Sequence, residues 1–107
     1  MPKGRIPVGL HGFKGTLFGK IAEKNDEKMT FTLKVQKVGR VWRENRATKA
    51  EEAIGKSLPI DLHRESRLLS QHQTTLRALN NGDVVEVELF HLKDNVLSVI
   101  ELLRKVD

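Results

Sequence analysis

The chain has 107 residues, the length of a single domain with one core. Hydrophobic residues make up 38% and charged residues 31% of it, which excludes a wholly disordered protein and a collagen-like one. The absence of cysteine excludes disulfides, thiolate catalysis and cysteine metal ligands. The net charge of +5 is uneven, because residues 1 to 50 contain 12 Lys or Arg and 4 Asp or Glu, against 7 and 10 in residues 51 to 107. An anionic partner should therefore meet the first half of the chain.

The chain contains no apolar run of about 18 residues, the length that a membrane-spanning helix requires. The N-terminal residues Met-Pro-Lys-Gly-Arg are not followed by the apolar stretch of a signal peptide. We therefore expect a soluble protein without a membrane span. The cytoplasm is slightly favoured, a fragment of an exported protein stays open as an alternative, and the oligomeric state is not indicated.

Residues 1 to 12 contain two of the three prolines and three glycines, and this composition predicts a flexible N-terminal arm. The folded domain is expected to span residues 13 to 107. A first strand is predicted over residues 13 to 21, where apolar and polar residues alternate, and residues 24 to 28 form a turn. The second strand alternates most clearly, from Met29 to about Arg43, with a bulge or bend near residues 37 to 39 where the parity changes.

The segment from residue 44 to 55 loses this alternation and predicts one or two helical turns. Thr48 and Glu51 fit a capping box, and Gly55 is placed to end the helix. A short third strand is predicted over residues 58 to 62, with Pro59 at a position without a ladder donor.

A second helix of about ten residues is predicted next, with Ser70 and Gln73 as its capping box. The sequence Asn80-Asn81-Gly82 ends it. Two further strands follow, over residues 84 to 89 and 96 to 103, joined by a turn at residues 93 to 95. The predicted order is therefore three strands, a helix and two strands, with a short helical insert between the second and third strands.

This order of elements resembles the OB-fold, a five-stranded Greek-key barrel with one helix between its third and fourth strands. Glycines in the first strand and the segment L-x-x-L-x-x-G-D-V-V-E-V-E from Leu76 to Glu88 carry the resemblance, which covers residues 13 to 104. We therefore expect a mainly β protein, a single OB-like barrel. An SH3-like or other small β-barrel is the alternative. The resemblance implies a ligand surface on the outer face of strands two and three and on the adjoining loops.

Cations and aromatic rings alternate with the core positions of the first two strands. Cations can neutralise phosphates and rings can stack on unpaired bases, so this face is a candidate site for single-stranded nucleic acid or another polyanion. A basic cluster continues it, with five cations between residues 37 and 49. The candidate ligand-binding residues are Phe18, Lys20, Lys34, Lys37, Arg40, Trp42, Arg43 and Arg46.

Two other interpretations stay open for this face. Phe18 and Trp42 can instead pack beneath the insert, and alternating lysines also keep exposed strands from aggregating. The basic cluster would equally suit an acidic protein surface or anionic lipid headgroups. The alternative function is therefore a protein-interaction or accessory domain of a larger, exported bacterial protein.

No pattern for catalysis, a metal or a cofactor is recognisable, and we expect a non-enzymatic binding module with none of these. The sequence has no nucleophile elbow and no phosphate-binding glycine loop. Glu86 and Glu88 are interpreted as solvated charges, partnered by Lys14 or Lys20 on the first strand. His91 is expected to have a structural, hydrogen-bonded role. The histidines lack metal-site spacing; they are His11, His63, His72 and His91.

Overall fold

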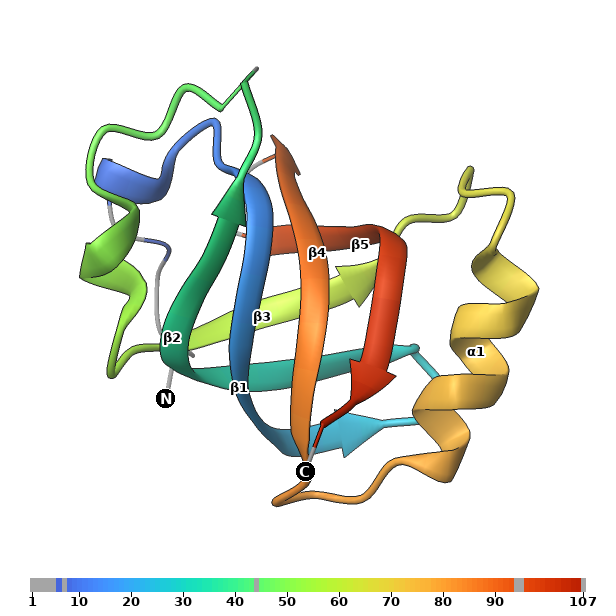
Figure 1. Cartoon of the computed structure of the whole chain (residues 1–107). Helices are drawn as coiled ribbons and strands as arrows, with labels where there is room; N and C mark the ends of the chain where they lie inside the picture. The colour runs from blue at the N-terminus through green and yellow to red at the C-terminus, as the bar shows by residue number, and fades with distance from the viewer. Residues whose placement is uncertain (1–5, 7, 44, 94–95, 107) are drawn as a thin grey trace.

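Five strands close into a barrel in this computed structural model, which describes residues 6, 8 to 43, 45 to 93 and 96 to 106. Around the barrel the order is β1-β2-β3-β5-β4, and β4 pairs with β1 to close it (Figure 1). Neighbouring strands are antiparallel except β3 and β5, which are parallel. The strands are β1 (Lys14–Asn25), β2 (Thr30–Val41), β3 (Ser57–Leu62), β4 (Val84–Lys93) and β5 (Val96–Lys105).

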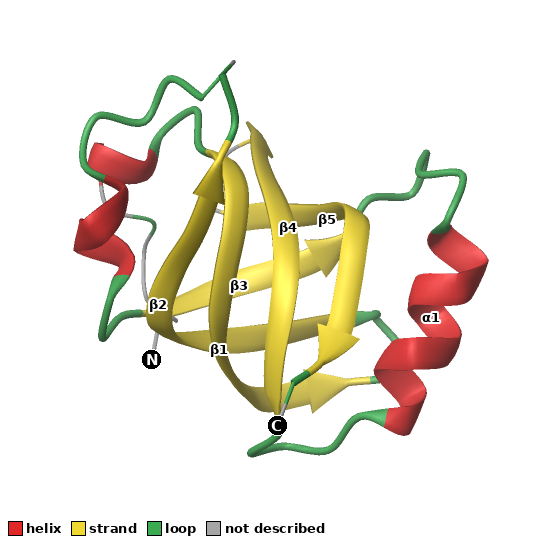
Figure 2. Ribbon diagram, viewed as in Figure 1, coloured by secondary structure: helices red, strands yellow, loops and turns green. Residues whose placement is uncertain are grey.

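One α-helix, α1 (Leu69–Ala78), connects β3 to β4, and two short 3₁₀ turns, η1 (Val8–Leu10) and η2 (Ala50–Ala53), precede β1 and β3. Figure 2 shows the two 3₁₀ turns on one side of the barrel and α1 on the other. The predicted fold class is therefore confirmed: a mainly β, five-stranded closed barrel with one helix between its third and fourth strands. Among the described residues, no helix has the length and apolar character needed to cross a bilayer.

The period-2 pattern of the strands builds the core, as the sequence predicts. Phe31, Leu33 and Val35 of β2 are buried, and so are Val85 and Val87 of β4 on the facing wall. Alternate side chains of a strand point to opposite faces, so each strand presents a second, outer set of residues to solvent or to covering segments. This outer set carries the polar chemistry described below.

The predicted bend near residues 37 to 39 is also confirmed. Phe18 pairs with Lys37 whereas Gly19 pairs with Val35, so β2 has an extra residue there, and a second irregularity follows between Val38 and Val41. Such bulges increase the local twist of a strand. They allow β2 to bend from its pairing with β3 into its pairing with β1.

The N-terminal segment is packed onto the barrel where the structure describes it. Leu10 is completely buried and Ile6 is 5% exposed, and both belong to the core. The insert covers this segment, because Arg46 donates its backbone N–H to the carbonyl of Gly12 at 3.1 Å, and Lys49 does so to Gly9. The core therefore extends upstream of the boundary expected at residue 13; residues 1 to 5 and 7 of the predicted arm lie outside the described residues.

Both predicted capping boxes are wrong. The N-cap of η2 is Lys49 and that of α1 is Leu68, and neither makes a side-chain capping bond. Instead, Ser66 accepts the backbone N–H of Leu68 at 3.1 Å and donates its hydroxyl to the carbonyl of Ile100 in β5 at 2.6 Å. A contact with a distant strand therefore fixes where α1 begins, and local spacing could not predict it.

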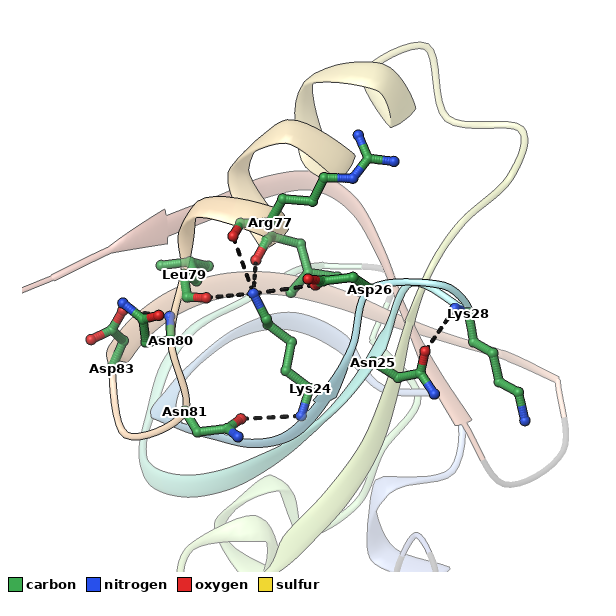
Figure 3. A network of polar contacts seen from close by, with 10 residues as sticks. Lys24, Asn25, Asp26, Lys28, Arg77, Leu79, Asn80, Asn81 and Asp83 are labelled. Carbon is green, nitrogen blue, oxygen red and sulfur yellow. Dashed lines mark hydrogen bonds and ion pairs between the residues drawn. The ribbon is translucent and has the colours of Figure 1, made fainter.

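Lys24, at the far end of β1, holds the C-terminal end of α1 (Figure 3). Its ammonium group donates to the carbonyls of Leu76, Arg77 and Leu79 and lies 3.2 Å from a carboxylate oxygen of Asp26. The last carbonyls of a helix have no partners within the helix, and a cation there also offsets the negative end of the helix dipole. Lys24 therefore joins the β1–β2 hairpin to α1.

Candidate functional site

Three exposed lysines lie on the outer face of β1 and β2, and we call them the lysine strip: Lys20, Lys34 and Lys37. Lys20 and Lys34 are direct cross-strand partners, and Lys37 is the partner of Phe18, two residues before Lys20. Within the described part of the chain, none of the three forms an ion pair with a carboxylate. Like charges placed directly opposite each other in a sheet are destabilising, so a bound anion would stabilise this arrangement.

Phe18 lies across β2 because residue 39 has no side chain. A Cβ atom on Gly39 would lie 2.8 Å from Cε1 of Phe18 and 3.2 Å from the carbonyl oxygen of Thr16. The Lys37 ammonium is 4.6 Å from the centre of the Phe18 ring. Lys37 and the half-buried Phe18 ring are thus held together on the outer face. The sequence predicts each of them as a residue of this face.

A second pairing of cation and ring lies at the other end of the β1–β2 face. The Arg40 guanidinium is 4.6 Å from the centre of the Trp42 ring. Trp42 is half-buried just beyond β2, and its backbone N–H donates to the carbonyl of Lys14 at 2.9 Å. The β1–β2 face therefore has the lysine strip at its Lys20 end. Arg40 and Trp42 lie at its Lys14 end.

The last two predicted binding residues lie outside the sheet. Arg43 and Arg46 are exposed in the loop that leaves β2. The backbone of Arg46 bonds to Gly12, and its Cβ lies against the same glycine. The structure thus places six of the predicted residues on or next to the β1–β2 pair, Arg43 in the loop just after β2, and Arg46 in the insert that covers the N-terminal segment.

An open pocket of about 400 Å³ adjoins Trp42, and it was not predicted from the sequence. Its lining combines two rings, two carboxylates and an ammonium group: Lys14, Trp42, Glu88, Phe90 and Glu101. Glu88 is 7% exposed, and among the described residues its carboxylate has neither a hydrogen bond nor an ion pair. Burial raises the pKa of Glu88 above its ordinary value, the charge of Glu101 raises it further, and Arg40 opposes this shift.

An irregularity in β5 brings Glu101 to the pocket. Val87 pairs with Leu103 and Leu89 with Val99, so residues 100 to 102 face Glu88 alone. Side chains from the α1 segment support this bulge, because Nε2 of the buried His72 donates to the carbonyl of Glu101 at 3.0 Å. The bulge could not be read from the alternation of residues 96 to 103, since it depends on a helix that precedes them by about 30 residues in the chain.

The expected partners of the two strand-four carboxylates are wrong. Glu86 bonds to Arg104 of β5, with Nε at 2.7 Å. The residues opposite Glu86 and Glu88 on β1 are Phe18 and Thr16 instead of lysines. The register of β1 with β4 decides this pairing, and the sequence does not specify that register.

Three of the four histidines, His11, His72 and His91, make side-chain contacts within the fold. Nδ1 of His91 accepts the backbone N–H of Gly12 at 3.0 Å, which confirms the expected hydrogen-bonded role, and its ring stacks on His11 with 5.1 Å between centres. No group of three histidine or carboxylate side chains suited to a metal ion occurs in the described ranges.

Comparisons with protein-family models, with characterised proteins and with solved structures gave no match to this chain. The proposals that follow therefore depend on its own residues and geometry.

Proposed function

We propose that this chain is a non-enzymatic binding module of the OB type, and that the β1–β2 face binds single-stranded nucleic acid. The strand order β1-β2-β3-β5-β4, the parallel pairing of β3 with β5 and the position of α1 support the OB assignment. OB barrels bind extended oligonucleotides on an outer face, so the fold suits this function without requiring it.

The observation that carries the proposal is the Lys20–Lys34 pair, which no carboxylate of the described residues neutralises. A folded chain gains nothing from two ammonium groups placed opposite each other on neighbouring strands, because their repulsion opposes the pairing of β1 with β2. A phosphate group between them would turn this repulsion into attraction and would release counterions from the nucleic acid. Lys37 adds a third charge beside the same two strands.

The two aromatic residues favour an unpaired strand over a duplex. Phe18 and Trp42 are half-buried, so each ring is held in place and keeps part of its surface accessible. Bases stack on such rings only when they are not paired with another strand. The distance from Lys20 to Lys14 along β1 is about 20 Å at about 3.3 Å per residue, enough for several nucleotides.

Fluorescence anisotropy with a labelled thymidine decamer at low salt tests the proposal. We expect the protein to bind the decamer and Lys34→Ala to weaken the affinity several-fold, with a smaller dependence on salt. Arg77→Ala is the matched control, since it also removes one exposed cation but lies on α1 (Figure 3). We expect Arg77→Ala to bind like the unchanged protein.

Two outcomes would overturn the proposal. If the decamer does not bind at low salt, the lysine strip faces an acidic protein surface or another partner. If Lys34→Ala and Arg77→Ala weaken binding equally, the attraction comes from net charge and not from the strip.

A further inference from the structure

The pocket beside Trp42 lies where the β1–β2 face ends, so a strand bound along that face would reach it. Lys14 is the link, because it lines the pocket and its carbonyl bonds to the backbone of Trp42. On the opposite side of β1, Lys14 pairs with Phe90 of β4. Trp42, just beyond the end of β2, and Phe90 of β4 therefore flank the same residue from its two sides.

This placement puts an aromatic ring on each side of Lys14, at the wall of the same pocket. Neighbouring strands lie about 4.8 Å apart, so positions on either side of β1 are separated by about 9.6 Å at the backbone. Both rings line the pocket and are half-buried. A flat heteroaromatic group could contact both of them, and stacking on aromatic side chains is how proteins hold single unpaired bases.

The polar groups of the pocket are both donors and acceptors. Glu88 and Glu101 accept hydrogen bonds, and the Lys14 ammonium, 5.5 Å from the centre of the Phe90 ring, donates them. A simple cation would satisfy the carboxylates but would be repelled by Lys14 and by the nearby Arg40. The pocket therefore suits a neutral ligand that presents N–H groups to a carboxylate and an acceptor to a lysine.

We infer that this pocket receives one base of the bound strand and prefers guanine, whose two adjacent N–H donors match the Glu88 carboxylate while O6 accepts from Lys14. The inference rests on the proposed function. Guanine is the common base with an N1–H group and an N2 amino group side by side, next to a carbonyl. Thymine offers one N–H between two carbonyls, and adenine and cytosine offer an amino group beside a bare ring nitrogen.

Burial makes the Glu88 carboxylate an effective contact. The residue is 7% exposed, its carboxylate lines the open pocket, and no described residue donates a hydrogen bond to it. A base that fills the pocket displaces water from this carboxylate, so a base with two N–H donors replaces the lost hydrogen bonds, whereas a base without them leaves the charge unsatisfied. Burial is also the main cause of the raised pKa of Glu88, and the neighbouring charge of Glu101 adds to it.

The experiment compares three decamers by anisotropy: all thymidine, thymidine with one central guanine, and thymidine with inosine at that position. Inosine lacks the N2 amino group and otherwise resembles guanine. We expect the guanine decamer to bind about tenfold more tightly than the thymidine decamer, as one bidentate contact to a base provides. The inosine decamer should fall between the two.

Two variants assign this preference to the pocket. Glu88→Gln keeps the shape of the side chain but replaces one acceptor oxygen by a donor, so the ratio between the guanine and thymidine affinities should fall to about one. Glu86→Gln is the control, because Glu86 lies on the same strand, bonds to Arg104 and does not line the pocket. Its ratio should stay near that of the unchanged protein, and thermal unfolding will verify that both variants are folded.

The outcomes separate the two proposals. If the unchanged protein binds all three decamers equally, or if Glu88→Gln keeps the full guanine preference, the pocket does not read the base while the lysine strip still binds the strand. If the inosine decamer equals the guanine decamer, the bidentate contact is wrong. If none of the decamers binds, the proposed function itself fails, and this inference fails with it.

Discussion

Two lysines of β1, Lys24 and Lys20, differ in their burial and in the partners of their charges. Lys24 has a side chain only 13% exposed, donates to two carbonyls of α1 and to that of the following Leu79, and pairs with Asp26. Lys20, four residues earlier, is exposed, faces Lys34 and has no ion pair within the described residues. The charge of Lys24 is thus used within the fold, whereas no described carboxylate neutralises the charges of the lysine strip. The predictions below test this difference between a structural and a binding cation.

The largest expected effect is on Lys24. We expect Lys24→Met to lower the free energy of unfolding by about 2–3 kcal/mol, because three helix carbonyls lose a charged donor in a half-buried place. Urea denaturation monitored by circular dichroism measures this change. Lys28→Met in the same hairpin is the control, since Lys28 is exposed, and its effect should stay within about 0.5 kcal/mol. Equal effects of the two substitutions would show that Lys24 does not hold the helix.

The second-largest effect on stability is expected at Gly39, which lies against the Phe18 ring beside the lysine strip. Gly39→Ala should lower stability by about 1–2 kcal/mol, because the new Cβ overlaps the Phe18 ring and approaches the backbone of Thr16. In a Phe18→Ala background the same change should cost clearly less, since the ring is absent. A double-mutant cycle by urea denaturation measures the difference. An identical cost in both backgrounds would contradict the described position of Phe18.

The stability of the folded protein should depend on pH through Glu88, which lines the pocket. The pKa of Glu88 is raised above its ordinary value of 4.5, so the folded protein favours the protonated form, and stability is lost as pH rises through the raised pKa. Glu88→Gln stays neutral at every pH. It should therefore raise the melting temperature at pH 7 and leave it nearly unchanged at pH 4. A lower melting temperature than the unchanged protein at pH 7 would mean that the Glu88 charge is satisfied within the fold.

Substitutions in the lysine strip should have the smallest effect on stability. The double substitution Lys20→Ala and Lys34→Ala removes a repulsive cross-strand pair, so the free energy of unfolding should rise by a few tenths of a kcal/mol at low salt. The gain should shrink as added salt screens the charges. Chemical denaturation at two salt concentrations measures it. A loss comparable to that of Lys24→Met would assign these lysines to the fold instead of to a partner.

Local alternation was sufficient to predict the barrel walls. The positions of Phe31, Leu33 and Val35 follow from the period of a half-buried strand, and the change of parity near Gly39 predicted the bend of β2. The outer face of β1 and β2 followed from the same pattern. Its lysines and rings were therefore recognisable in advance.

Contacts between distant segments were not predictable in this way. Composition indicated a loose N-terminal arm, yet Leu10 is buried in the core, and the insert bonds to Gly9 and Gly12 on either side of it. The pocket depends on a β5 bulge that His72 supports, and on the register that sets Phe90 beside Lys14. Such arrangements are decided when strands pair across the whole chain, and no single segment contains the information.

The salt dependence of oligonucleotide binding tests the central claim most directly. The thymidine decamer is titrated at several salt concentrations while the fluorescence of Trp42, the single tryptophan, is followed. We predict a linear fall of the logarithm of the affinity with the logarithm of salt, with a slope smaller by about two in the Lys20→Ala and Lys34→Ala variant than in the unchanged protein. The same slope in both proteins would contradict the account.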